Sequence, residues 1–505
     1  MVVCDLAAAE PAVRRRGEDG PMSDDKSDRY LSEWTVRARM AEEMIPMIGR
    51  LYRDRGVIIT VLGHSLVGKS ATEIIQLHRV GSAVVDLEIS IHDSFPMLQI
   101  IAGLDLAPAR IDLGNLVTHL RGEPEGMDPA VLVQRELSEV CTGRTSRRPE
   151  PQDIVLYGFG RIGRLIARIL VGKTGGGDSL RLRAIVVRPG GDNDLAKRAS
   201  LLRRDSVHGS MSGQIDLDPE ENALVVNGNM IRVLYANSPD EVDYTQYGIR
   251  NAIVIDNTGK WRTREQLALH LKSPGASSVV LTAPAKGDLP NIVYGVNHEG
   301  IAEAGPIISA ASCTTNAIAP VLKAVSDEFG VLSGHVESVH SFTNDQNLID
   351  NYHPKERRGR AASLNMVITS TGAAKAVAKT LPELEGKLTG NAIRVPTPNV
   401  SLAILSLQLG RQTRIDELNS YLRMTSLEGP LQNQIDYVVS TEVASTDFVG
   451  NRFAGIVDSK ATIVNGDHCT LYVWYDNEFG YSRQVIRCVE EMAGLVMPNL
   501  PQRAS

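Results

Sequence analysis

Residues 153–170 read DIVLYGFGRIGRLIARIL, an apolar run followed by spaced glycines and an amphipathic segment. Gly158, Gly160 and Gly163 have the G-x-G-x-x-G spacing of a dinucleotide-binding turn between a strand and a helix. The first glycine permits the tight turn, the second lets the backbone approach a pyrophosphate, and the third lets the helix pack on the strand. The helix N-terminus then faces the phosphates. We therefore predict a Rossmann domain for NAD or NADP, rather than an ordinary glycine turn; the other residues of the turn are Phe159, Arg161 and Ile162.

The end of the second strand bears on the choice between NAD and NADP. An NAD site usually has Asp or Glu there, which binds the ribose hydroxyls. Here the run AIVV is followed by Arg188, and an arginine can bind a 2′-phosphate that a carboxylate would repel. The sequence therefore favours NADP. Two alternatives stay open: Asp192 or Asp194 folds back onto the ribose, or Arg188 is only a surface charge.

The spacing of apolar runs along the sequence predicts the fold class. From residue 153 the short runs IVLYG, LRAIVV, NAIVID and SSVVLTA alternate with helix-like segments, which indicates βαβ units and a parallel sheet. After residue 313 the runs are longer and alternate more, which indicates a mixed or antiparallel sheet. We predict an α/β protein with a Rossmann domain over 151–312, completed by a C-terminal helix within 477–505, and an α+β catalytic domain over 313–476.

A mostly α-helical extension is predicted before these domains. Apolar residues recur at helical spacing from Ala41 to Leu51, and the polar segment TGRTSRRPEPQ predicts a linker at the end of an extension over 29–150. Residues 1–28 lack apolar periodicity and are predicted to form a disordered tail, within which Met22 is an alternative start.

The extension also contains a G-x-x-x-x-G-K-S pattern in the stretch VIITVLGHSLVGKS, residues 57–70. Such a loop holds nucleotide phosphates with its backbone amides and Lys69, and holds magnesium with Ser70. However, about 110 mostly helical residues are too few for the multistranded parallel sheet on which such loops are built. We therefore predict a helical turn here and keep nucleotide binding as the alternative.

Composition limits the partners and the compartment. Lys and Arg number 53 against 60 Asp and Glu, so the net charge is −7 and nucleic acid is not the expected partner. Apolar runs are too short to span a membrane, and charged residues interrupt the N-terminus where a signal peptide would be apolar. We expect a cytoplasmic protein. Its five cysteines are scattered without a C-x-x-C pair, so no metal site is predicted.

The stretch SAASCTTNAIAPVLKAV, residues 309–325, places Cys313 at the start of a predicted helix. Free amides and the helix dipole at that position would lower the pKa of the thiol. His340, in ESVHSFT, follows at a distance that a helix and a returning strand would span. A thiolate beside an imidazole can attack a carbonyl, with the imidazole taking up the proton. A buried, unreactive cysteine is the alternative.

Residues 153–490 resemble the phosphorylating glyceraldehyde-3-phosphate dehydrogenases. The stretches that carry the resemblance are GFGRIGR, LLRRDSVHG, GVNHEG, SCTTNAIAP, STGAAKAV, PELEGKLTGNAIRVPTPNVS and WYDNEFGYS. The resemblance implies that Cys313 is the nucleophile, and that His340 is the acid/base and an oxyanion donor. The implied reaction oxidises glyceraldehyde 3-phosphate through a cysteine thioester, which inorganic phosphate then cleaves to an acyl phosphate. The family is typically tetrameric, so a homo-oligomer is implied.

The resemblance also assigns binding residues. Thr343 and Arg394 match the site for the substrate's phosphate. The site for the attacking inorganic phosphate is matched by Ser312, Thr371, Gly372 and Arg357, with Thr314 beside them. Asn477 matches the residue that holds the nicotinamide carboxamide. The wall around the cofactor is matched by Thr258, Gly259, Thr282 and Pro284.

The loop NDQNLIDNYHPKERRGRAAS, residues 344–363, is most similar to that of chloroplast and other biosynthetic members that use NADP. It also resembles the loop of erythrose-4-phosphate dehydrogenase, which hydrolyses its thioester, whereas STGAAK favours the phosphorylating enzyme. One further alternative is a sensor or scaffold that keeps the dehydrogenase core for binding and acts through its extension.

Overall fold

The glycine-rich turn lies in an eight-stranded sheet with the order β11-β10-β9-β4-β5-β8-β7-β6. The computed structural model describes residues 24–85, 87–141, 151–173 and 180–502. The six strands from β11 to β8 run parallel, and β7 and β6 form an antiparallel edge. The strands are β4 (Gln152–Tyr157), β5 (Leu180–Val187), β6 (Ile215–Asp218), β7 (Ala223–Val226), β8 (Asn229–Tyr235), β9 (Ala252–Asp256), β10 (Ala276–Leu281) and β11 (Ile307–Ser309).

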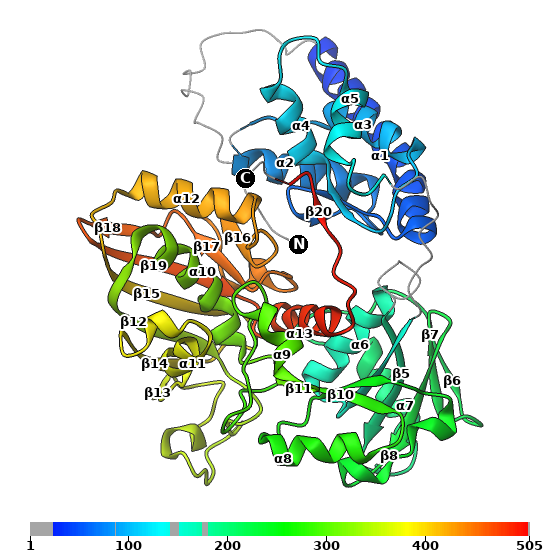
Figure 1. Cartoon of the computed structure of the whole chain (residues 1–505), viewed down its shortest axis with the longest axis vertical. Helices are drawn as coiled ribbons and strands as arrows, with labels where there is room; N and C mark the ends of the chain where they lie inside the picture. The colour runs from blue at the N-terminus through cyan, green and yellow to red at the C-terminus, as the bar shows by residue number, and fades with distance from the viewer. Residues whose placement is uncertain (1–23, 86, 142–150, 174–179, 503–505) are drawn as a thin grey trace.

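Helices cover this sheet, as expected for βαβ units (Figure 1). The turn leads from β4 into α6, whose apolar face packs on the sheet together with that of α13. This arrangement confirms the predicted Rossmann domain and its completion by a C-terminal helix. The helices of the domain are α6 (Arg161–Lys173), α7 (Asp194–Arg203), α8 (Arg264–Leu267), α9 (Ile301–Ala304) and α13 (Phe479–Met492).

The catalytic domain is built on a second sheet with the order β13-β14-β12-β15-β19-β17-β16, to which β18 adds by pairing with β19. It contains both parallel and antiparallel pairs, so the predicted mixed sheet is confirmed. The strands are β12 (Val331–Ser341), β13 (Val367–Thr369), β14 (Leu388–Val395), β15 (Ser401–Leu409), β16 (Ile435–Val438), β17 (Gly455–Asp458), β18 (Ile463–Asn465) and β19 (His468–Tyr475). The helices α10 (Cys313–Phe329), α11 (Ala373–Thr380) and α12 (Ile415–Leu427) share its core.

The N-terminal extension forms a module with its own core, in which helices surround a small sheet of order β2-β1-β3-β20. The predicted helices are present, but the sheet was not predicted, and α1 begins at Asp24 inside the predicted tail. The elements are α1 (Asp24–Arg55), β1 (Ile58–Val61), β2 (His64–Ser65), α2 (Ala71–Val85), α3 (Ile91–Gly103), β3 (Arg110–Asp112), α4 (Leu113–Gly122) and α5 (Pro129–Glu136). Residues 1–23 and most of the predicted linker lie outside the described residues.

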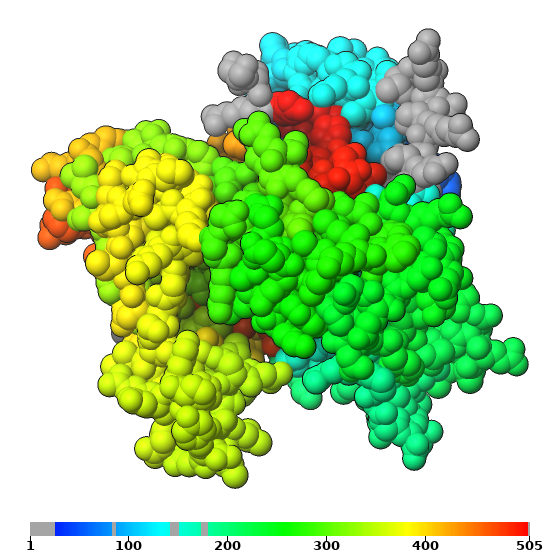
Figure 2. Space-filling view, turned by 60° about the horizontal axis from the view of Figure 1, so that its bottom comes forward, coloured from blue at the N-terminus to red at the C-terminus, as the bar shows by residue number. Residues whose placement is uncertain are grey.

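The C-terminus joins this module instead of ending in the Rossmann domain. After α13 the chain crosses to the module, where β20 (Asn499–Leu500) pairs in parallel with β3. Figure 2 shows the C-terminal segment lying against the module. The prediction that residues 477–505 belong to the Rossmann domain therefore holds for α13 but not for β20.

The G-x-x-x-x-G-K-S segment is neither the predicted helical turn nor a phosphate-binding loop. Leu62 and Gly63 have positive φ angles of 44° and 80° and form a hairpin turn, after which β2 pairs antiparallel with β1. The amides of these two residues donate to the Asp112 carboxylate at 2.9 and 2.7 Å. Because an internal carboxylate already binds these amides, they are not arranged around a nucleotide phosphate.

No helix in the described ranges is long and apolar enough to cross a bilayer.

Candidate active site

Cys313 is the first residue of α10, directly after a strained turn that leaves β11. Ala311 has a φ of 54°, an uncommon conformation for a residue with a side chain. Tyr481 holds this turn by donating from its hydroxyl to the Ala311 carbonyl at 3.0 Å. Ser312 caps the helix, since its hydroxyl accepts from the Thr315 amide at 3.0 Å. The strain and these contacts fix the direction in which the thiol points.

His340 lies beside the thiol, with its Nε2 3.5 Å from Cys313 Sγ. It comes from the end of β12, where Arg394 is its register partner on the parallel strand β14. The structure thus brings together the nucleophile, the acid/base and one of the anion-binding residues that the sequence indicated. Four elements meet at this site, because β11, β12 and β14 end near it and α10 begins there.

The other ring nitrogen of His340 has two competing partners. Its Nδ1 lies 2.7 Å from the Ser341 carbonyl oxygen and 2.7 Å from Nη1 of Arg394. A carbonyl only accepts and a guanidinium only donates, so Nδ1 can satisfy one of the two at a time. With the proton on Nδ1, the bare Nε2 is a base facing the thiol; with Nδ1 accepting from Arg394, Nε2–H is a donor. Arg394 also donates to the Ser341 carbonyl at 2.8 Å.

The protonation of the pair follows from its burial. Burial raises the pKa of the Cys313 thiol, and this outweighs the opposing effects of the Arg394 charge and of the Thr314 hydrogen bonds. Burial and then the Arg394 charge lower the pKa of His340 to about 3. The backbone amides at the helix N-terminus lower the pKa of the thiol as expected, but burial outweighs this contribution. At neutral pH the site holds a thiol and a neutral imidazole, so attack on a carbonyl requires His340 as the base.

Alkylation of Cys313 by iodoacetamide should accordingly depend steeply on pH. Only the thiolate reacts, so below the thiol pKa the rate is expected to rise about tenfold for each pH unit. Mass spectrometry of the peptide that contains Cys313 measures the rate without interference from other thiols. A rate that is flat between about pH 6 and pH 8 would instead indicate a preformed thiolate and imidazolium pair.

The predicted anion-binding residues are placed around this pair to different degrees. Arg394 is the most closely placed, and its buried Nε makes no hydrogen bond with the described residues. Thr343 follows β12 by two residues, and its hydroxyl donates to Asp345. Thr314 lies one residue after the nucleophile and shares a hydrogen bond of 3.0 Å with the Tyr475 hydroxyl.

Thr371 and Gly372 precede α11, which packs beside α10 in the catalytic core. The Thr371 hydroxyl accepts from the Ala373 amide at 3.2 Å and thereby caps the helix start. A Cβ at Gly372 would meet no heavy atom within 4 Å, so the backbone there is accessible. Amides at a helix N-terminus beside an open backbone position suit the oxygens of a phosphate.

Arg357 and Arg358 exchange the expected roles. Arg357 is exposed and donates to the Ile368 carbonyl at 3.4 Å, so the structure does not bring it to the site. Arg358 is 8% exposed, forms an ion pair with Asp345 and donates to the Thr369 hydroxyl at 3.2 Å. Its charge also reaches His340 and Arg394, whose pKa values it lowers as a secondary contribution after burial. Arg358 is therefore a second buried cation near the active site, beside Arg394, and sequence reasoning missed it.

Substitution of each of the two arginines by glutamine separates their roles. Arg358→Gln should raise the KM for the phosphorylated substrate or for inorganic phosphate by about 10- to 100-fold, the effect of losing a charged hydrogen bond. Arg357→Gln is the matched control, because it removes the same group from the adjacent, exposed position. Steady-state kinetics of both variants measures the effect; a larger KM change in Arg357→Gln would restore the sequence-based assignment.

The glycine turn has the shape that a dinucleotide requires. Gly158 has a φ of 97°, and a Cβ there would lie 3.1 Å from the Thr258 side chain. A Cβ at Gly163 would lie 2.7 Å from the Gly158 carbonyl, so only glycine lets α6 approach β4 this closely. A Cβ at Gly160 would meet nothing within 4 Å, which leaves its backbone open to a ligand. Phe159 is buried and Ile162 packs on the domain core.

Three other cofactor residues lie at the same edge of this sheet, and a fourth, Asn477, lies in the catalytic domain. Thr258 and Gly259 follow β9, and the Thr258 hydroxyl donates to Asp256 at 2.7 Å. Thr282 follows β10 and donates from its amide to the Asp256 carbonyl at 3.0 Å. Asn477 follows β19, and its amide oxygen accepts from the Ser401 hydroxyl at 2.9 Å. The carboxyl ends of parallel strands are where such cofactors bind, so these residues fit a dinucleotide.

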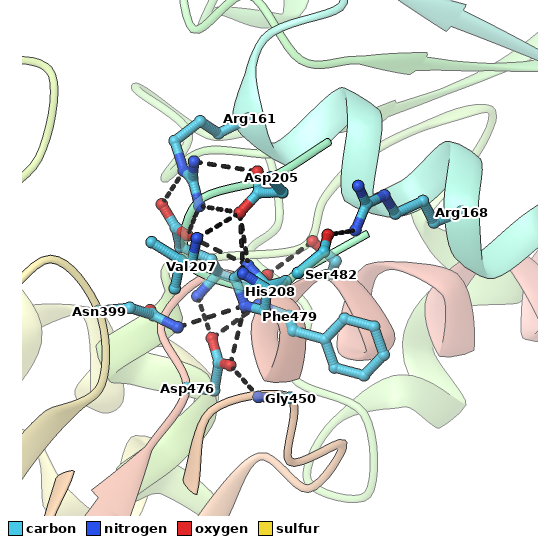
Figure 3. Close-up of polar contacts among 12 residues, drawn as sticks. Arg161, Arg168, Asp205, Val207, His208, Asn399, Gly450, Asp476, Phe479 and Ser482 are labelled. Carbon is cyan, nitrogen blue, oxygen red and sulfur yellow. Dashed lines mark hydrogen bonds and ion pairs between the residues drawn. The ribbon is translucent and has the colours of Figure 1, made fainter. Parts of the chain in front are cut away.

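The side chain of Arg161, the arginine of the glycine turn, binds carboxylates of the protein and not the cofactor. Its guanidinium binds Glu478, with Nε 2.5 Å from the carboxylate, and Asp205 at 3.1 Å (Figure 3). Asp205 accepts from the His208 amide, and His208 Nε2 lies 3.1 Å from Asp476. This network fixes the strand end that carries Asn477. The motifs LLRRDSVHG and WYDNEFGYS contain these residues, but only the fold shows that the two stretches meet.

Arg188 lies at the end of β5, next to the strand that leads into the glycine turn. Its side chain is exposed, as a residue that receives a 2′-phosphate from solvent must be. Asp194 is not available to a ribose, since it binds Arg198 at 2.7 Å and the Tyr235 hydroxyl at 3.0 Å. The alternative in which Asp194 folds back onto the cofactor therefore has no support in the structure.

The chain was compared with known families and proteins. Residues 152–264 match the profile of the NAD binding domain of glyceraldehyde 3-phosphate dehydrogenase, and residues 312–477 match that of its C-terminal domain. A glyceraldehyde-3-phosphate dehydrogenase-like protein of Pseudomonas aeruginosa is 58% identical over 461 residues, which cover 91% of this chain and 100% of the relative. This match is longer than the catalytic core, so it includes part of the extension.

Two further relatives match the core. The glyceraldehyde-3-phosphate dehydrogenase 2 of Trichormus variabilis is 39% identical over 342 residues, which cover 67% of this chain and 98% of the relative. The chloroplastic glyceraldehyde-3-phosphate dehydrogenase GAPA1 of Arabidopsis thaliana is 42% identical over 343 residues, 67% of this chain and 83% of the relative. These matches confirm the resemblance seen in the sequence. With its paired cysteine and histidine and its dinucleotide turn, the chain belongs to the glyceraldehyde-3-phosphate dehydrogenase family of oxidoreductases.

Proposed function

We propose that the protein is a phosphorylating dehydrogenase that oxidises glyceraldehyde 3-phosphate with NAD(P) and inorganic phosphate. The observation that carries this proposal is the 3.5 Å contact between Cys313 and His340, with Arg394 beside the imidazole. A nucleophile, a base and a buried guanidinium are what acyl transfer on a phosphorylated aldehyde needs.

In the first half-reaction, Cys313 Sγ forms a bond to the aldehyde carbon while His340 Nε2 takes the thiol proton and returns it to the carbonyl oxygen. The nicotinamide ring, when bound, accepts a hydride from that carbon. His340 removes the hydroxyl proton at the same step, and a thioester on Cys313 remains. The hydrogen bond between Asn477 and Ser401 holds the carboxamide-binding residue in place for this transfer.

In the second half-reaction, a phosphate oxygen attacks the thioester carbonyl and the Cys313 sulfur leaves with its electron pair. His340 then returns a proton to the sulfur. The accessible start of α11 and the buried Arg358 supply donors for an attacking phosphate, separate from Arg394. Two anion sites distinguish a phosphorylating enzyme from one that hydrolyses its thioester, as erythrose-4-phosphate dehydrogenase does.

Steady-state kinetics with glyceraldehyde 3-phosphate tests this function. Turnover of the whole chain should depend on inorganic phosphate, and the product should be an acyl phosphate. Turnover that is equal without phosphate would instead support the hydrolytic alternative. Absence of turnover with both triose and tetrose phosphates would support the sensor or scaffold.

NADP is the cofactor we propose, on the basis of the exposed Arg188 at the end of β5. Arg188→Asp should shift the ratio of kcat/KM for NADP over NAD towards NAD by about 10- to 100-fold, because a favourable charge contact becomes a repulsive one. Kinetics with both cofactors on the same preparation measures the ratio and cancels any general loss of activity. A ratio that does not change would show that Arg188 does not bind the 2′-phosphate.

We also propose that the protein forms homo-oligomers. The segment 343–366 follows β12 and projects from the catalytic domain (Figure 2). Several large apolar side chains are widely exposed in it: Leu348 at 73%, Ile349 at 72%, Tyr352 at 87% and Leu364 at 81%. Large exposed apolar side chains within one segment are typical of a protein interface, and the tetramers common in this family give it a partner in a second copy.

A further inference from the structure

A cavity of about 550 Å³ lies where the N-terminal module meets the enzyme core, outside the active site described above. Its walls come from three parts of the chain: α1, β1, β2, α2 and β3 of the module, α6 of the Rossmann domain, and residues 450–453 with the start of α13. Direct contacts hold the walls together. The Tyr52 hydroxyl donates to the Gly172 carbonyl at 3.4 Å, and the His64 ring packs edge-on against Phe453 at 5.9 Å.

The cavity is strongly cationic. Five of its lining side chains carry a positive charge: Lys69, Arg110, Arg168, Arg452 and Arg483. Among the lining residues that the structure describes, Glu73 is the sole carboxylate, and its ion pair at 2.9 Å is with Lys69. The described lining residues therefore carry more positive than negative charge.

Three arginines of the wall lack carboxylate partners in the described part of the chain. Arg110 makes no side-chain hydrogen bond or ion pair there, and the buried Nε of Arg452 also has no acceptor. Arg168 binds only backbone carbonyls, those of Leu202 at 2.8 and 3.0 Å and of Gly209 at 3.0 Å. Partly buried charges without an ion-pair partner are costly, so an anion in the cavity would stabilise this arrangement.

The titration of Arg452 agrees with this excess of positive charge. Burial, and then the neighbouring charges of Arg110 and Arg483, lower the pKa of Arg452 to about 9. The carboxylates of Asp436 and Asp112 oppose this change but do not overcome it. A bound anion would raise the pKa of Arg452 again, and the charged guanidinium would in turn hold the anion.

Apolar and aromatic side chains also line the cavity, and the Arg452 guanidinium lies 5.2 Å from the centre of the Phe453 ring. Tyr52, Phe453 and Phe479 present rings, and aliphatic side chains such as Val80 and Ile169 complete the surface. A site for inorganic phosphate alone would not need this surface. A volume of this size also suits an organic molecule and not a single small ion.

We propose that this cavity binds a small organic phosphate of the nucleotide class, with its phosphates on Lys69, Arg110 and Arg452 and its base against the aromatic side chains. The G-x-x-x-x-G-K-S segment contributes to this site in a different way from a phosphate-binding loop. Its backbone amides bind Asp112, whereas the side chain of Lys69 lines the cavity. Side-chain cations, and not a ring of amides, would therefore hold the phosphates.

Calorimetric titration of the whole protein with adenosine 5′-diphosphate tests the proposal. Binding at the cavity is distinguished from binding at the Rossmann site by the cavity variants, because these substitutions lie outside the cofactor residues of the Rossmann domain. One molecule should bind per chain at the cavity, beside any bound in the Rossmann site, and Arg110→Gln and Lys69→Gln should each weaken the cavity binding by about tenfold or more, the effect of one charged hydrogen bond. Arg37→Gln is the matched control, since Arg37 is an exposed arginine of α1 in the same module and does not line the cavity.

The outcomes separate the proposal from its alternatives. Absence of binding, or an affinity that neither Arg110→Gln nor Lys69→Gln changes, would overturn it. Thermal unfolding of each variant shows whether it is folded, and Lys69→Gln keeps the test valid if Arg110→Gln is not, because Lys69 lies at the partly exposed start of α2. Pyrophosphate in place of the nucleotide should bind more weakly; equal affinity would overturn the role of the aromatic side chains. The readout is binding, so a failure here is independent of catalytic turnover.

Discussion

Replacing Cys313 with serine is expected to lower kcat for aldehyde oxidation by roughly 10⁴-fold or more, the typical cost of removing a catalytic nucleophile. Serine has nearly the same shape, but its hydroxyl is far less acidic than a thiol, and burial already raises the pKa of the thiol itself. His340 cannot make an effective nucleophile of a hydroxyl at the same position. Affinity for NADP should change little, because the cofactor residues lie on other elements.

Cys141→Ser is the matched control for this experiment. Cys141 is a free, partly exposed cysteine of the N-terminal module, so its substitution tests for effects of thiol loss in general. The measurement is steady-state kinetics together with a cofactor-binding titration on both variants. Turnover of Cys313→Ser at the rate of the unmodified chain would refute the assigned nucleophile.

Replacing His340 with glutamine should lower kcat by about 10²- to 10⁴-fold, the range for loss of a general base. Glutamine preserves a polar group of similar reach but cannot accept the thiol proton. Because the thiol is then deprotonated only by solvent, the remaining activity should increase with pH more steeply than that of the unmodified enzyme. Kinetics from about pH 6 to pH 9 measures both effects.

His335→Gln provides the control on the same strand. His335 is five residues away on β12, so it points to the opposite face, where it binds Thr389 at 2.8 Å and Asn391 at 2.7 Å. This variant tests whether glutamine in β12 disturbs the sheet. Equal losses of activity in the two variants would mean that His340 acts through the structure of the strand and not as a base.

The sequence predicted the parts of the fold and site that rest on local patterns. The glycine turn is readable because Gly158 and Gly163 meet steric limits that only glycine satisfies. The Ser312 cap and the apolar periodicity predict the helix that begins at Cys313. The pairing with His340 was anticipated from spacing and from the family resemblance, and the 3.5 Å contact confirms that the two side chains meet.

Two features of the site depend on three-dimensional surroundings that spacing does not encode. Adjacent arginines point in different directions, and the local turn decides that Arg358 and not Arg357 is buried. The pKa of the Cys313 thiol is set by burial among segments that are distant in sequence. The helix N-terminus therefore predicted one contribution to the thiol pKa and not the larger, opposite contribution of burial.

The N-terminal module shows the same limit for long-range pairing. Its strands are so short that they give almost no periodic signal, and β20 comes from the other end of the chain to pair with β3. A short G-x-x-x-x-G-K-S pattern suggested either a helix or a nucleotide loop. The Asp112 carboxylate, 50 residues away from Leu62 in the sequence, accepts a hydrogen bond from the Leu62 amide and so stabilises a hairpin. The cationic cavity joins three distant segments and could be found only in the fold.

The central claim is that Cys313 forms a thioester and that inorganic phosphate then attacks the carbonyl carbon of this thioester. The most direct measurement is mass spectrometry of the chain after rapid mixing with glyceraldehyde 3-phosphate and NADP, in a buffer free of phosphate. We expect the mass of one 3-phosphoglyceroyl group on the peptide that contains Cys313, and its disappearance when phosphate is added. Formation of NADPH without an adduct on Cys313, or an adduct that phosphate does not remove, would contradict the account.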